Sequence, residues 1–194
     1  MIDIRTRHID IEDDNLNCII EYPVIETIED DSFVEYINKK IYEDVIIFKE
    51  ISEEEAIYSK EKSNIFIDYK VQLNKNNLIS ISIVFSEIYK NNYIINYINA
   101  YNYDLKNKNQ ILIEDIFKKE PSCMEFSKNQ TNNLKNLILI KSINAQSFYI
   151  TEEYISINFS SYEITDSSEI EEIELYFKDL EKYLSKYTKK YILE

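Results

Sequence analysis

Three runs of alternating apolar and polar residues between positions 65 and 103 constrain the fold most. Every second residue from Ile65 to Leu73 is apolar, and Asn74-Lys75-Asn76-Asn77 then supplies turn chemistry. The chain returns with apolar residues at 79, 81, 83 and 85 on one face and with serines at 80, 82 and 86 on the other. After a second turn at 90–92, Tyr93–Tyr103 forms the third run. The pattern predicts an antiparallel meander with one buried face.

A long helix is predicted ahead of this meander. Ser32-Phe33-Val34-Glu35 fits a capping box, in which the hydroxyl and the carboxylate satisfy free amides at a helix start. A second box, Ser52-Glu53-Glu54-Glu55, predicts a restart that ends near Ser63. Between the boxes one apolar stripe recurs at helical spacing, formed by Val34, Ile37, Ile41, Val45 and Phe48.

The rest of the chain adds shorter elements. A short strand or 3₁₀ segment is predicted over 111–117, a helix from about Cys123 and a closing helix over Lys178–Ile192. Strands are predicted at Ile2–Ile11, at Leu16–Glu21 with Pro23 as the stop, and at Phe148–Thr151, Tyr154–Phe159 and Glu172–Tyr176. We therefore expect an α+β fold: an antiparallel meander with helices packed on one face, in an N-terminal lobe (1–100) and a C-terminal lobe (101–194).

The chain contains no glycine, and this excludes several kinds of site. A phosphate-binding P-loop, a dinucleotide-binding turn and the nucleophile elbow of hydrolases all need backbone conformations that glycine adopts at low cost. Asparagine becomes the best remaining residue for left-handed turn positions. With one histidine and two cysteines, the chain is also poor in the groups that most often bind zinc or transfer protons.

The formal net charge of −14 is unevenly distributed. Residues 1–63 contribute −11, residues 64–151 contribute +3 and residues 152–194 contribute −6. Such a field repels nucleic acid and anionic lipid, and it speeds the encounter with a basic partner. We therefore expect no nucleic-acid partner, although the acids also serve to keep a small protein soluble.

The sequence constrains the cellular compartment less than it constrains the fold. Cys18 and Cys123 are far apart in sequence and form no C-x-x-C pair, so we expect two buried free thiols. The segment Met1–Asp10 carries charges and no apolar core, unlike a secretory signal, and no run of apolar residues is long enough to span a membrane. The expectation is a cytoplasmic protein if Met1 is the native start, and an extracytoplasmic one if a leader was removed.

Two polar features have plain structural explanations. Asp10, Glu12, Asp14 and Glu21 match the carboxylate spacing of an EF-hand loop, but strand patterns on both sides replace the helices that such a loop needs. His8 lies in an alternating strand with no second histidine in the chain, so a surface position is favoured over a catalytic one. We expect no metal site and no cofactor.

A row of tyrosines is the candidate contact surface. Tyr93, Tyr97 and Tyr101 recur every four residues, so on a strand all three share one face. Such a face could stack on sugars or anchor a protein, because tyrosine offers a large contact area at low entropic cost. The alternative is cross-strand packing beneath a helix.

The order of these segments resembles a known family. Tyr22-Pro23-Val24-Ile25, Ile37-Asn38 and the hairpin Val71–Val84 resemble the N-terminal half of the extracytoplasmic region of RsiV-type anti-sigma factors. This pair of domains of unknown function also occurs beside bacterial polysaccharide deacetylases. The C-terminal half is similar in Tyr101-Asn102-Tyr103-Asp104-Leu105, in the L-x-D-x-F-like step at Leu112–Phe117, and in the closing segments from Phe148-Tyr149-Ile150-Thr151 through Ile173–Leu180.

The resemblance implies a two-lobed, non-catalytic α+β binding domain. In the RsiV branch the ligand is lysozyme, a basic protein that an acidic chain suits. The family's Gly-Gly-Ala-His turn is replaced here by Lys90-Asn91-Asn92-Tyr93, so no role of that turn carries over. We expect a basic protein or a cell-wall glycan as partner; the alternatives are a carbohydrate-active enzyme that uses two carboxylates and a purely structural accessory domain.

Overall fold

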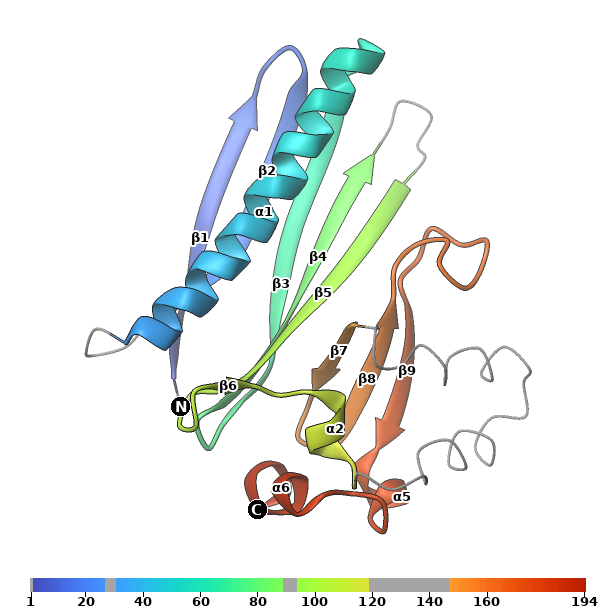
Figure 1. Ribbon diagram of the computed structural model, residues 1–194. Helices are drawn as coiled ribbons and strands as arrows, with labels where there is room; N and C mark the ends of the chain where they lie inside the picture. The colour runs from blue at the N-terminus through green and yellow to red at the C-terminus, as the bar shows by residue number, and fades with distance from the viewer. Residues whose placement is uncertain (1, 27–30, 89–93, 119–146) are drawn as a thin grey trace.

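The computed structural model describes residues 2–26, 31–88, 94–118 and 147–194 as an α+β protein with two sheets (Figure 1). The larger sheet has the order β1-β2-β3-β4-β5-β6 and the smaller one β7-β8-β9. The strands are β1 (Asp3–Glu12), β2 (Leu16–Glu26), β3 (Ser63–Lys75), β4 (Leu78–Ile88), β5 (Ile94–Asp104), β6 (Asn109–Gln110), β7 (Ser147–Ile150), β8 (Tyr154–Phe159) and β9 (Glu171–Tyr176). The helices are α1 (Ser32–Ser59), α2 (Ile113–Ile116), α5 (Phe177–Leu180), α6 (Lys186–Thr188) and the π-helix η2 (Lys189–Leu193).

The predicted meander is confirmed as β3, β4 and β5. These strands pair antiparallel, with Phe85 of β4 opposite both Ile67 of β3 and Tyr97 of β5. Earlier in the sequence, β1 and β2 form an antiparallel hairpin of the same sheet, and β2 pairs with β3 in parallel. Because a parallel pair needs a crossover, α1 connects β2 to β3 and lies across one face of the sheet (Figure 1).

Helix α1 is one continuous element, and the predicted restart at Ser52 is wrong. Ser52 is buried inside a helix that runs from Ser32 to Ser59 without a break, on the same side as Val45 and Ala56. The capping residue is Asp31, one position before the serine of the predicted box. Its carboxylate accepts a hydrogen bond from the Phe33 amide at 2.9 Å. It ends at Lys60, which takes the left-handed conformation that glycine usually supplies (φ 57°).

The predicted use of asparagine at left-handed positions is confirmed between β3 and β4. Asn76 and Asn77 both have positive φ, 53° and 62°. Pro23, by contrast, does not end its strand, and β2 continues to Glu26. Pairing between β2 and β3 stops at Ile20, so Pro23 has a partner strand on one side only and its missing amide leaves no ladder bond unmade.

The polar face of the meander is also buried where the second sheet meets it. Ser80 and Asn102 are at most 3% exposed, and the Ser80 hydroxyl donates to Asn102 Oδ1 at 2.6 Å. The edge of β7 docks on this pair, since Asn102 Nδ2 donates to the Phe148 carbonyl at 2.6 Å and the Ile150 amide donates to Ser80 Oγ at 2.8 Å. The expectation of a single buried face was therefore wrong at this end of the sheet.

The predicted closing helix is broken into short pieces. Phe117 pairs with Leu184 as an isolated bridge, and Ser185 donates its amide to the Ile116 carbonyl. These contacts with the segment around α2 interrupt the helical pattern between α5 and α6. The predicted element at 111–117 is the four-residue helix α2. The helix predicted from Cys123 lies outside the described residues, and so does that cysteine; Cys18 is free and buried.

Two hydrophobic clusters hold the described residues together. One fills the space between α1 and β2–β5. The other joins the small sheet to the C-terminal pieces and takes Leu73 and Leu78 from the β3–β4 hairpin. The division predicted at residue 100 falls inside β5, a strand of the larger sheet that also contacts β7 and β8 of the smaller one.

Candidate functional site

The tyrosines of the predicted row differ in how far they are buried. Tyr101 lies beneath α1, 3% exposed, and its hydroxyl donates to Asp44 Oδ2 at 2.7 Å. Burial, reinforced by the Asp44 carboxylate, raises the pKa of the Tyr101 hydroxyl. Tyr97 is 46% exposed, with its ring 6.1 Å from that of Phe48 on α1. Tyr93 lies outside the described residues. Tyr101 thus packs under the helix, while Tyr97 offers surface at its flank.

The solvent side of α1 beside Tyr97 carries an unusual set of side chains. Ile47 and Ile51 are each 52% exposed and Tyr58 is 92% exposed, at positions that helical spacing places opposite the buried stripe. Glu43, Glu50 and Glu54 share this side, and all three are exposed. We call these six residues the outer face of α1. Figure 1 shows no described element in front of it.

The charge of α1 is also one-sided along its length. The helix contains seven acidic residues and three lysines, and all three lysines precede residue 50. Lys39 and Lys49 each lie beside a glutamate four residues later, at 3.5 Å from Glu43 and 2.7 Å from Glu53. The C-terminal half of the outer face therefore combines apolar side chains with carboxylates and no cation.

This surface was not predicted from the sequence, although a signal for it existed. Ile47 and Ile51 are separated by four residues and lie off the apolar stripe that predicted the buried side. A second apolar pair on the polar side of an amphipathic helix is unexplained by core packing, and it makes this side of the helix a candidate contact surface.

The other polar features have local structural roles. His8 is exposed on β1, with Nδ1 3.6 Å from the Glu21 carboxylate on β2. The acidic turn between these strands is closed by Asp13, whose carboxylate accepts hydrogen bonds from the Asn15 and Leu16 amides at 2.8 Å. These bonds lower the pKa of Asp13. Among the described residues, no group of three or more potential ligands is arranged to hold a metal ion.

The fold is shared with solved structures of unassigned function. The chain is similar to a DUF3298 family protein from Bacteroides fragilis, with a TM-score of 0.67 and 16% identity over 96% of this chain and 95% of that one. It is also similar to a DUF3298 family protein from Pseudomonas aeruginosa, with a TM-score of 0.61 and 9% identity over 96% and 93% of the two chains. No protein-family model matches the sequence, and no curated protein matches it.

These likenesses define the class of protein by fold: an α+β domain of the architecture seen in DUF3298 structures, proteins whose function is unknown. At such low identity they carry no residue of a site across. None of the helices in the described ranges combines the length and apolar character that crossing a bilayer requires.

Proposed function

We propose that this protein is a non-catalytic binding domain that recognises a basic protein through the outer face of α1 and the neighbouring Tyr97. The observation that carries the proposal is the exposure of Ile47, Ile51 and Tyr58 among carboxylates on a helix face that no described element covers. The resemblance to the lysozyme-binding region of RsiV-type anti-sigma factors supports a protein ligand of this charge.

The geometry suits a partner with a groove. Side chains at positions 47, 51 and 58 follow the spacing with which an amphipathic helix inserts into an apolar groove on another protein. The rim of Glu43, Glu50 and Glu54 then faces the edges of that groove, where lysine and arginine would neutralise it. An anionic glycan would be repelled by the same carboxylates, so the observations favour a basic protein over such a glycan.

Replacing Ile51 with serine is expected to weaken binding to lysozyme, the probe, about tenfold. An apolar anchor near the centre of an interface typically contributes more than 1 kcal/mol, and 1.4 kcal/mol corresponds to a factor of ten. Titration calorimetry measures the change, with wild-type binding expected at micromolar concentration. Far-ultraviolet circular dichroism of the variant checks that the exposed substitution leaves the fold intact.

Ile19 provides a control on the other side of the sheet. It is 41% exposed on β2, and its neighbours Cys18 and Ile20 are buried in the cluster with α1, so its side chain lies on the sheet face away from that helix. Ile19→Ser makes the same change at an exposed position outside the proposed site and should bind like wild type. Equal losses in the two variants would contradict the placement of the site, and no heat with lysozyme would contradict this choice of partner. Heat with peptidoglycan fragments alone would favour the glycan instead.

A further inference from the structure

A pair of tyrosines on the small sheet forms a second surface, remote in sequence from α1. Tyr154 and Tyr176 are directly opposite each other on β8 and β9, with ring centroids 5.2 Å apart and ring planes at 49°. Tyr149 of β7 adds a third ring, 6.4 Å from that of Tyr154. Tyr149 is buried, whereas Tyr154 and Tyr176 are partly exposed. Two ring faces are therefore within reach of a ligand.

Carboxylates surround these rings. The Tyr176 hydroxyl donates to Glu174 at 2.6 Å, and the Tyr149 hydroxyl donates to Glu172 at 3.1 Å. Glu153 is held beside Tyr176 by the tight β7–β8 turn, because its amide donates to Thr151 Oγ1 and its carbonyl accepts from the Phe177 amide. Electron-rich rings bordered by negative charge attract organic cations.

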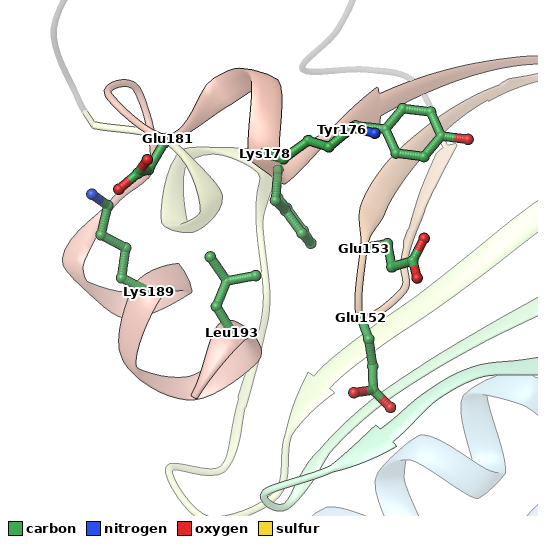
Figure 2. Close-up of a pocket in the computed structure, with 8 residues that line it drawn as sticks. Glu152, Glu153, Tyr176, Lys178, Glu181, Lys189 and Leu193 are labelled. Carbon is green, nitrogen blue, oxygen red and sulfur yellow. The ribbon is translucent and has the colours of Figure 1, made fainter.

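One of the protein's own lysines already lies in such a position. The ammonium of Lys178 lies over the Tyr176 ring, 5.2 Å from its centroid (Figure 2). The ring and the lysine border an open pocket of about 550 Å³, with Glu153 on the same wall and with Phe177 and Leu193 as its apolar part. Figure 2 shows Lys178 extending along this wall toward the ring, where an incoming cation would compete with it.

We propose that this pocket binds an organic ammonium group on the Tyr176 ring, with Lys178 occupying the position when no ligand is present. The apolar part of the pocket receives the methyl or methylene groups next to the nitrogen. Glu153 on the pocket wall supplies the opposite charge, and Glu174 adds to it from outside the pocket, at the Tyr176 hydroxyl. The ammonium can belong to a small quaternary amine or to a lysine side chain of a polypeptide. The site is separate from the outer face of α1 and does not depend on the function proposed for that face.

Choline and its uncharged isostere 3,3-dimethylbutan-1-ol test the proposal on the intact chain. Choline should shift the nuclear magnetic resonance signals of the Tyr154 and Tyr176 rings saturably at millimolar concentration, while the alcohol should leave them unchanged. Lys178→Gln should tighten choline binding about fivefold, since it removes the competing cation. Tyr176→Leu and Glu153→Gln should each weaken it.

The source of the ammonium is decided by a parallel titration with Nα-acetyl-lysine amide. Tighter binding of this compound than of choline identifies a polypeptide ligand, and the reverse identifies a small quaternary amine; either outcome supports the site. Equal shifts with choline and with the alcohol would overturn the proposal. Choline binding to Lys178→Gln that is weaker than or equal to that of the wild type would overturn it as well. The same holds if neither protein shows a saturable shift.

Discussion

Replacing Asn102 with alanine should lower the free energy of unfolding by about 3 kcal/mol. The side chain is buried and holds the second sheet against the first, with one hydrogen bond from Ser80 and one to the Phe148 carbonyl. Removing it leaves the buried Ser80 hydroxyl and the half-buried Phe148 carbonyl without these partners, and each such group costs about 1–3 kcal/mol. Urea denaturation followed by circular dichroism gives the change in unfolding free energy.

Two further variants test the physical reason for this loss. Asn109→Ala removes an exposed asparagine side chain from the short strand β6 and should change stability by less than about 0.5 kcal/mol. The double variant Ser80→Ala with Asn102→Ala should lose less than the sum of the single losses, because both side chains belong to one hydrogen-bonded group. A loss below about 1 kcal/mol in Asn102→Ala, or strict additivity, would show that the pair does not hold the two sheets together.

The protein should unfold cooperatively as the pH rises from about 10 to about 12. Burial, with Tyr36 and Asp44 nearby, raises the pKa of Tyr103 to about 12, and burial also raises the pKa values of Tyr101 and Tyr187. In the unfolded chain tyrosine ionises near pH 10. Because the folded pKa is the higher one, the unfolded state releases its protons first; stability is therefore intact below about pH 10 and is lost as the pH rises through the folded pKa.

Tyrosinate absorbance and circular dichroism, recorded together across this range, measure the transition. The buried tyrosines Tyr101 and Tyr103 and the half-buried Tyr187 should ionise together with the loss of the helical signal. Tyr103→Phe removes a buried hydroxyl and should move unfolding to higher pH, whereas Tyr58→Phe should not. A helical signal that survives full ionisation of the tyrosines would contradict this account.

The meander could be predicted because its information is local. Alternation of Ile79, Ile81 and Ile83 with serines specifies strand, face and register without knowledge of the rest of the chain. The start of α1 could be predicted within one residue for the same reason, since caps act over one turn. The closing helix could not, because the bridge between Phe117 and Leu184 that interrupts it joins residues distant in sequence.

The candidate site was likewise predictable only in the part that depends on local sequence. The tyrosine spacing correctly placed Tyr97 and Tyr101 on one face of a strand, but whether that face is covered depends on where α1 crosses the sheet. Tyr101 lies under the helix, bonded to Asp44, and Tyr97 lies at its flank beside Phe48. Periodicity cannot supply this distinction, because it describes one element and not the position of its neighbour.

The amino-acid sequence by itself determined the strands of the meander, the helix ahead of them and the acidic character of the chain. Each of these follows from side chains within a few residues of one another, or from composition alone. Only the tertiary structure decided that the serine face of β4 receives the second sheet, that Tyr101 is core, and that Ile47 and Ile51 stay exposed. Burial is a property of packed pairs of elements, so it emerges only when distant segments meet.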